Sequence, residues 1–207
     1  MSGGRMDAWS RWEETWALAG LPARREPFER LCARYGEAHR GYHDLEHVAA
    51  CLALAAESRA LLRSPAEVEL ALWYHDAVYD PKRGDNEERS ADLARDELRA
   101  QGLAESSIDT VHAHILATKH PSRPDDPDAR LLVDIDLSIL AADPERFDAY
   151  EAGVRKEYAW VPGFLFRRNR AAFLRELLAS DRLFLTDLFH ERFERRAREN
   201  VARSLAR

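Results

Sequence analysis

Three short segments place histidines and carboxylates inside otherwise apolar sequence. They are YHDLEH at residues 42–47, WYHD at residues 73–76 and LLVDIDL at residues 131–137. An uncompensated carboxylate or imidazolium is costly to bury, so such residues need a partner that offsets their desolvation. A divalent metal ion can serve, because imidazole nitrogen and carboxylate oxygen are good ligands for Zn, Fe, Mn and Co. Together the segments predict a mixed nitrogen and oxygen site with open positions for water and a substrate.

Each segment taken alone also has an ordinary structural interpretation. A His-Asp dipeptide is often a buried polar pair, and two histidines four residues apart on a helix are often structural. Asp134 or Asp136 can instead cap a helix or pair with an arginine. The metal interpretation is favoured because the three segments occur in one chain, each within apolar sequence.

The elements that must position these residues are predicted to be helices, because apolar residues recur with a helical period along the chain. The tryptophans Trp9, Trp12 and Trp16 share one face, which we expect in the core rather than at a ligand. No stretch shows convincing strand-like alternation, apart from the short segment LLVDID. The predicted helices cover residues 9–19, 27–35, 44–62, 65–79, 85–99, 106–120, 129–141, 144–160, 166–179 and 190–205.

These helices place the candidate ligands in defined positions. His43 and His47 are four residues apart, so we expect them on one face of one helix. His75-Asp76 is expected inside the following apolar helix. Asp85 with Glu88 fits a capping box, which predicts that a further helix begins there. The fold class expected from this pattern is all-α.

Length and composition set limits on the kind of protein. The 207 residues suit one domain over residues 1–207, with a core at about 27–180 and terminal helices packed on it. The net charge of −6 argues against binding a nucleic-acid polymer, which needs a broad basic face. Cys32 and Cys51 form no CxxC pair, which favours a reducing compartment. Neither a signal peptide nor a membrane span is recognisable, so a cytoplasmic location is expected.

The ordered motifs resemble those of the HD-domain superfamily of metal-dependent phosphohydrolases. YHDLEHV, ALWYHDAVYDP, DNEERSA, ILATKH and DIDLSIL are similar in particular to a group of small bacterial proteins described as predicted HD-superfamily phosphohydrolases. The resemblance spans roughly residues 42–175. It implies an HD-type helical bundle, a divalent metal cofactor (Mn, Fe, Zn, Co, Ni or Mg) and a small phosphorylated substrate such as a phosphate ester or nucleotide. Water activated by the metal would be the nucleophile.

The resemblance also implies roles for individual residues. His75-Asp76 matches the HD doublet, and Asp136 matches the closing aspartate of the family better than Asp134 does. The YHxxxH spelling is similar to that of cyclic-nucleotide phosphodiesterases in this superfamily. By that match His47 is the metal ligand, while His43 is the general acid or a phosphate contact.

Further residues have implied roles nearer the substrate. Asp80 matches one half of a Glu-Asp pair that orients water in alarmone-hydrolysing members, whereas Tyr79 stands in place of the glutamate. This difference disfavours an alarmone hydrolase and leaves Asp80 as a candidate catalytic residue. His112, His114 and His120 are candidates for a second metal or for phosphate. His112 and His114 are two residues apart, so a helix cannot point both at one place.

Cationic side chains are needed to bind phosphate, and Arg suits its geometry. We expect Lys119, Arg155 and Lys156 to bind substrate, the last two because apolar residues flank them. Other candidates are Arg83 and Asn86, which follow HDAVYD, together with Arg167, Arg168 and Arg170.

Two rival functions fit parts of the pattern. His43, Glu46 and His47 spell HxxEH, a zinc metallopeptidase motif in which the glutamate is the general base. That function also needs a sheet edge to bind extended peptide, and no sheet is predicted. The second rival is a catalytically silent HD domain that binds metal or nucleotide. The intact set of candidate ligands favours an enzyme over this alternative.

Overall fold

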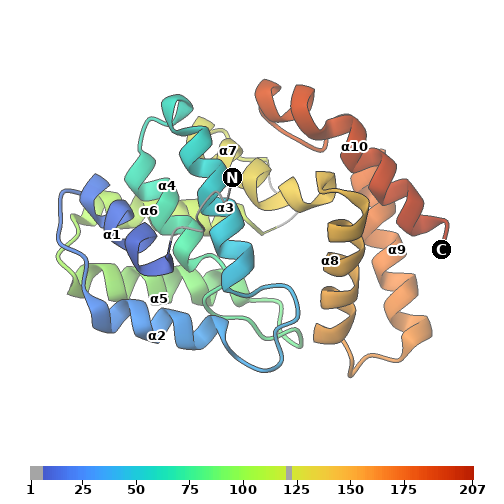
Figure 1. The fold of residues 1–207 in the computed structure, drawn as a ribbon, viewed down its shortest axis with the longest axis horizontal. Coiled ribbons are helices and arrows are strands. Elements are labelled where there is room, and N and C mark those ends of the chain that lie inside the picture. Colours follow the sequence, from blue (N-terminus) through green and yellow to red (C-terminus); the bar gives the residue numbers. More distant parts are fainter. Residues whose placement is uncertain (1–6, 120–122) are drawn as a thin grey trace.

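The computed structural model describes residues 7–119 and 123–207, and all regular elements in these ranges are helical (Figure 1). The predicted all-α class is therefore confirmed for the described chain, and LLVDID is helical rather than a strand. The α-helices are α1 (Ala8–Leu18), α2 (Arg25–Tyr35), α3 (Leu45–Glu57), α4 (Pro65–Tyr74), α5 (Asn86–Ala100), α6 (Glu105–Ala117), α7 (Pro127–Leu137), α8 (Pro144–Glu157), α9 (Gly163–Ala179) and α10 (Asp187–Leu205). Two 3₁₀ segments, η1 (Arg59–Leu61) and η2 (Ser138–Ala141), extend α3 and α7.

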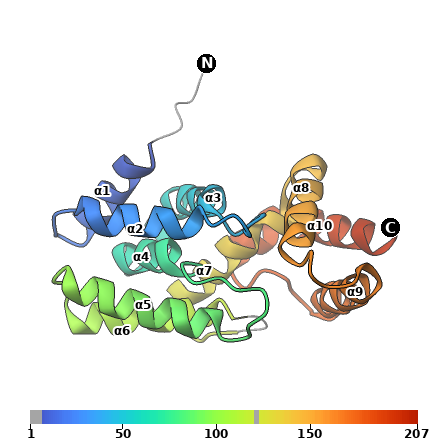
Figure 2. The same cartoon turned by 90° about the horizontal axis from the view of Figure 1, so that it is seen from below.

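Helix α4 is the centre of the larger part of the molecule. It packs against α1, α3, α5, α6 and α7, and every residue from Val68 to Tyr74 is buried. Figure 2 shows α1 and α2 on one side of α4, with α5 and α6 on the other. A helix that is apolar all round is expected to be buried in this way. Helices α8 to α10 lie to one side, next to the end of α7 (Figure 1).

The predicted extension of α4 to residue 79 is wrong, because the helix ends at Tyr74. The backbone carbonyl groups that follow have partners elsewhere in the molecule. Arg40 donates to the carbonyl oxygens of Asp76 and Ala77 at 2.8 and 3.2 Å. These tertiary hydrogen bonds compete with a further helical turn. His75 and Asp76 therefore lie at the end of the helix, where their side chains project toward other elements.

The start of α3 also differs from the sequence expectation. Asp44 caps the helix, and its carboxylate accepts hydrogen bonds from the backbone N–H groups of Glu46 and His47. His43 consequently lies before the helix and does not share a helical face with His47. The expected capping box of α5 is absent too, since the Asp85 side chain makes no cap hydrogen bond there.

The N-terminal tryptophans belong to the core, as predicted. Trp12 and Trp16 are fully buried, and Trp12 packs edge-on against Trp73 of α4 with ring centroids 5.2 Å apart. Such aromatic pairs contribute to stability beyond their buried area. No helix in the described ranges has the length and apolar character needed to cross a membrane.

Candidate metal centre

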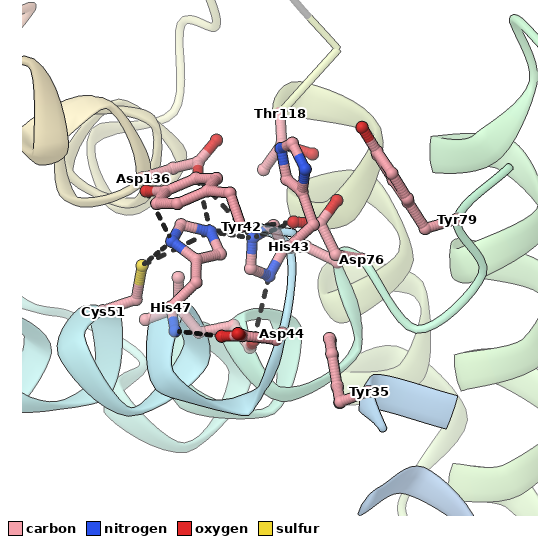
Figure 3. Close-up of polar contacts among 12 residues, drawn as sticks. Tyr35, Tyr42, His43, Asp44, His47, Cys51, Asp76, Tyr79, Thr118 and Asp136 are labelled. Carbon is pink, nitrogen blue, oxygen red and sulfur yellow. Dashed lines mark hydrogen bonds and ion pairs between the residues drawn. The ribbon is translucent and has the colours of Figure 1, made fainter. Parts of the chain in front are cut away.

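Three segments that are distant in sequence bring histidine and aspartate side chains together. His47 comes from the first turn of α3, His75 follows α4, and Asp136 lies in the last turn of α7. The Nε2 atoms of His47 and His75 are 3.0 Å apart, and Asp136 Oδ1 is 3.1 Å from His47 Nε2. Asp76 Oδ2 lies 3.1 Å from His75 Nε2. His47, His75, Asp76 and Asp136 are here called the His/Asp cluster, and Figure 3 labels three of them, His47, Asp76 and Asp136.

The spacing of these atoms fits a single bound cation. A metal ion with bonds of about 2.1 Å to nitrogen and oxygen keeps its ligand atoms about 3.0–3.4 Å apart. The remaining separations are 3.6 Å from His47 Nε2 to Asp76 and 3.6 Å from His75 Nε2 to Asp136. All five distances are close to the separation of neighbouring ligand atoms around one metal ion. The predicted cofactor is thus supported as a group of residues that can hold a metal ion.

The far side of each imidazole is also held in place. His75 Nδ1 donates to the carbonyl oxygen of Leu72 at 2.9 Å, which leaves the Nε2 lone pair directed into the cluster. The Tyr42 hydroxyl hydrogen-bonds to His47 Nδ1 at 2.9 Å, and Cys51 Sγ lies 3.7 Å from the same atom. Such contacts orient metal-binding imidazoles and raise their affinity.

The imidazoles and carboxylates of the cluster stabilise one another's charged forms. Burial opposes ionisation of Asp76, but the nearby His75 and His43 outweigh it and lower the pKa of this carboxyl. Burial likewise lowers the pKa of His75, whereas Asp76 and Asp136 raise it by a larger amount. Asp76 therefore remains an anion, which is the form that binds a metal.

Asp134 has a different environment from Asp136, although only one residue separates them. Its carboxylate accepts hydrogen bonds from the backbone N–H of Leu185 and from both the N–H and the hydroxyl of Thr186. Burial raises the pKa of Asp134 to about 6 despite these bonds. Asp134 thus anchors the chain just before α10, while Asp136 faces the histidines.

His43 is held beside the His/Asp cluster rather than in it. Its Nδ1 donates to Glu157 at 2.8 Å, and its ring stacks on Tyr79 with centroids 4.3 Å apart. Burial lowers the pKa of His43, but Asp76 and the bond to Glu157 outweigh it, so the pKa is raised. With Nδ1 engaged, Nε2 is the nitrogen left for a ligand in the adjoining cavity.

Glu157 is a residue of this site that the sequence analysis missed. One carboxylate oxygen accepts the backbone N–H groups of residues 41, 42 and 43, and the other accepts from His43 and the Tyr79 hydroxyl. Burial opposes its ionisation, but His43 and these bonds lower the pKa of Glu157 to about 2. A signal was present: Phe147, Tyr150, Val154 and Glu157 follow a helical period. A carboxylate on that apolar face required a buried partner.

The loop that carries His43 also depends on a close contact between two glycines. A Cβ atom added to Gly41 would lie 2.3 Å from the carbonyl oxygen of Gly153 in α8. A Cβ added to Gly153 would lie 2.6 Å from the carbonyl oxygen of Gly41. Only glycine permits the two backbones to meet here. This contact brings the loop within reach of Glu157.

A cavity of about 610 Å³ opens above the His/Asp cluster, here called the cluster cavity. This volume is in the usual range for small-molecule sites. His43, His75, Asp76 and Asp136 contribute to its lining. Several aromatic side chains line it as well, namely Tyr42, Tyr79, Tyr150, Tyr158, Trp160, Phe166 and Phe173.

The cations of the cluster cavity already have carboxylate partners. Lys119 pairs with Glu88 and also donates to a backbone carbonyl at 3.0 Å. Arg83 pairs with Asp85 at 2.6 Å, and Arg170 pairs with Glu151. Asn86 also lines this cavity, whereas Arg167 and Arg168 do not.

Other residues with predicted substrate roles lie elsewhere. Arg155 donates to the carbonyl oxygens of residues 158 and 161, so it ties the end of α8 to the following turn. Lys156 and Asp80 line a neighbouring cavity rather than the cluster cavity. The Asp80 carboxylate accepts the backbone N–H of Lys82 at 3.0 Å.

Two of the three histidines proposed for a second metal, His112 and His114, lie outside the His/Asp cluster. His112 lies 3.3 Å from Asp92, and His114 lies 3.3 Å from Asp126. The two imidazoles therefore face different carboxylates, as their spacing on a helix predicted. His120 lies outside the described residues.

Comparison with known proteins assigns no family to this arrangement. A scan against protein-family models matched none, and searches of curated proteins and of solved structures found no significant match. The described chain is all-helical and contains a His/Asp group able to hold a metal ion. Membership of the HD-domain superfamily stays a prediction from the motifs.

Proposed function

We propose that this chain is a metal-dependent phosphohydrolase of the HD-domain type that acts on a small phosphate ester or nucleotide. The observation that carries the proposal is the convergence of His47, His75 and Asp136 from three separate segments. Their spacing fits one cation, and Asp76 adds a second carboxylate beside them. A cavity large enough for a small molecule adjoins the group.

The residues around the cluster have complementary roles in hydrolysis. A divalent ion bound to the cluster would polarise a phosphoryl oxygen and lower the pKa of a water molecule. His43 has a raised pKa and presents Nε2 toward the cavity, so it can protonate the leaving oxygen. Glu157 fixes the orientation of that imidazole. These roles match those that the motifs implied.

The peptidase alternative fits the geometry poorly. His43 precedes α3 and is bound to Glu157, so His43 and His47 do not form a pair of ligands on one helix. Glu46 is exposed on α3 and does not line the cluster cavity. The described chain also contains no strand on which a peptide could extend.

The proposal is tested by metal analysis combined with a substrate screen. Purified protein is assayed for bound metal by mass spectrometry, then with phosphate monoesters and nucleotides in the presence of Mn, Co, Ni, Zn or Mg. His75→Ala and Asp136→Ala should each lose both metal and activity. Asp134→Asn is the matched control and should keep its metal, because Asp134 binds the backbone just before α10 and not the cluster.

The possible outcomes separate the alternatives. Metal-dependent hydrolysis that is lost in His75→Ala supports the proposal. Stable metal binding without hydrolysis of any phosphorylated substrate would instead indicate the catalytically silent domain. If Asp134→Asn loses the metal while Asp136→Ala retains it, the assignment of the closing aspartate is wrong.

A further inference from the structure

A second cavity, of about 680 Å³, adjoins the cluster cavity and shares Tyr79, Pro81 and Trp160 with it. Four cationic side chains line this second cavity, here called the basic cavity. They come from α2, the loop after α4, α5 and α8, and they are Arg34, Lys82, Arg89 and Lys156. Residues far apart in sequence thus bring positive charge to one place in a protein of net charge −6.

These four cations differ from those of the cluster cavity because they are not neutralised by carboxylates. None of the four forms an ion pair with any residue in the described ranges. Lys156 donates to the carbonyl oxygen of Arg40, and Lys82 lies near the Trp160 ring. Concentrated positive charge without partners attracts anions.

Three carboxylates line the basic cavity beside the four cations, but two of the three already have partners outside its lining. Glu37 pairs with Arg40 at 3.3 Å, and Glu157 is bound to His43. Asp80 is the remaining carboxylate in the lining. The balance in the cavity is therefore positive, and a ligand with two or more negative charges would complete it.

We propose that the basic cavity binds a small polyanion, such as a molecule with several phosphate groups. Its volume is typical of a small-molecule site. A nucleic-acid polymer is disfavoured, because the chain as a whole is acidic. The site is separate from the His/Asp cluster, none of whose four members lines the basic cavity.

Two residues that position His43 line the basic cavity, so an anion bound there would lie beside them. Tyr79 and Glu157 line this cavity, Tyr79 stacks on His43, and Glu157 binds its Nδ1. His39, which also lines the cavity, hydrogen-bonds to the carbonyl oxygen of Tyr79 at 2.7 Å. Binding is therefore expected to change the environment of His43, which makes the basic cavity a regulatory site for the proposed enzyme.

The binding experiment uses the full chain as purified and inorganic tripolyphosphate as the probe. Isothermal titration calorimetry should show one saturable site. Arg89→Glu and Lys156→Glu should each weaken binding about tenfold, because each reverses a charge that faces the anion. Arg95→Glu is the matched control on the same helix: Arg95 pairs with Asp92 and lines neither cavity. It should change the affinity less than twofold.

Two further measurements separate this site from the proposed catalytic function. Asp136→Ala should bind tripolyphosphate as the unmodified protein does, which shows that the probe does not bind at the metal. The imidazole NMR signal of His43 should shift on saturation, and the shift should be lost in Lys156→Glu.

Several results would overturn the proposal. They are no saturable binding at millimolar probe, equal weakening by Arg95→Glu, or loss of binding in Asp136→Ala. A His43 signal that stays fixed while the probe binds would refute the regulatory coupling. None of these results requires the protein to hydrolyse a phosphate ester.

Discussion

The two adjoining cavities share Tyr79, but they use charge in opposite ways. At the base of the cluster cavity, two imidazoles and two carboxylates of the His/Asp cluster lie within about one coordination sphere of one another. The cations that line this cavity are paired with other carboxylates. In the basic cavity, four cations lack ion-pair partners among the described residues. Tyr79 and Glu157 lie at the boundary.

The difference shows that the charge which the protein leaves unpaired in a cavity indicates the sign of the charge on its ligand. Converging lone pairs and carboxylates favour a cation, because their mutual repulsion is relieved when one binds. Converging cations favour an anion for the same reason. A count of charged residues alone would not distinguish the two cavities, since each contains both signs. The pairing pattern does so.

The largest effect is expected from Glu157→Gln, which removes the anion at the boundary between the cavities. Glutamine retains an acceptor for the backbone of residues 41–43 but no longer stabilises a protonated His43. We expect kcat to fall about 100-fold with metal content unchanged. Steady-state kinetics and metal analysis check this. Glu145→Gln, exposed in the first turn of α8, is the control and should leave kcat within twofold. Loss of the metal would assign Glu157 to the metal centre instead.

Gly41→Ala should be the next most damaging change. The added Cβ would meet the Gly153 carbonyl oxygen at 2.3 Å, so the loop with His43 must move away from α8. We expect the free energy of unfolding to fall by about 2 kcal/mol, and kcat to fall with it. Urea denaturation measures the first effect. Gly84→Ala, where a Cβ meets open space, should cost less than about 1 kcal/mol. Equal losses in the two variants would contradict the role of this contact.

Tyr79→Phe should have a smaller effect on kcat. It also distinguishes the roles of the two cavities, because both are lined by Tyr79. It removes the hydroxyl that donates to Glu157 at 2.9 Å, but it retains the ring that stacks on His43. Because one hydrogen bond to a charged group is lost, we expect kcat to fall about fivefold to tenfold. Tripolyphosphate affinity should remain unchanged, since the four cations are untouched. A large loss of affinity would show that the hydroxyl itself binds the anion.

The smallest expected effect is a dependence of stability on pH, caused by the Glu157 carboxylate. Its pKa is lowered to about 2 from an ordinary value of 4.5, so the folded protein binds this proton less tightly than the unfolded chain. The resulting stability is fully present above pH 4.5 and is lost as the pH falls toward 2. Denaturation curves between pH 5 and pH 3 should show a decline that is shallower in Glu157→Gln. Identical slopes would contradict the lowered pKa.

Much of the fold was predictable because the signals for helices are local. Pro65 and Pro144 stand at the first turns of α4 and α8, as their positions after Ser64 and Asp143 indicated. The end of α4 was not predictable in this way. Arg40, which is 36 residues from Asp76 in sequence, supplies the hydrogen bonds that accompany it. When a distant residue determines where a helix ends, the sequence of the helix itself does not indicate that end.

The sequence by itself predicted the all-helical class and the three segments that carry candidate ligands, because periodicity and charged residues in apolar segments are readable without a fold. The choice of His47 over His43 and of Asp136 over Asp134 came from the resemblance to the HD-domain superfamily. Only the tertiary structure decided which partners they meet. Glu157 reaches His43 across 114 residues. Packing likewise decides that the cations of the cluster cavity form ion pairs, whereas the four cations of the basic cavity have no ion-pair partner among the described residues. Electrostatic contacts depend on distance in space, which the order of residues along a chain does not specify.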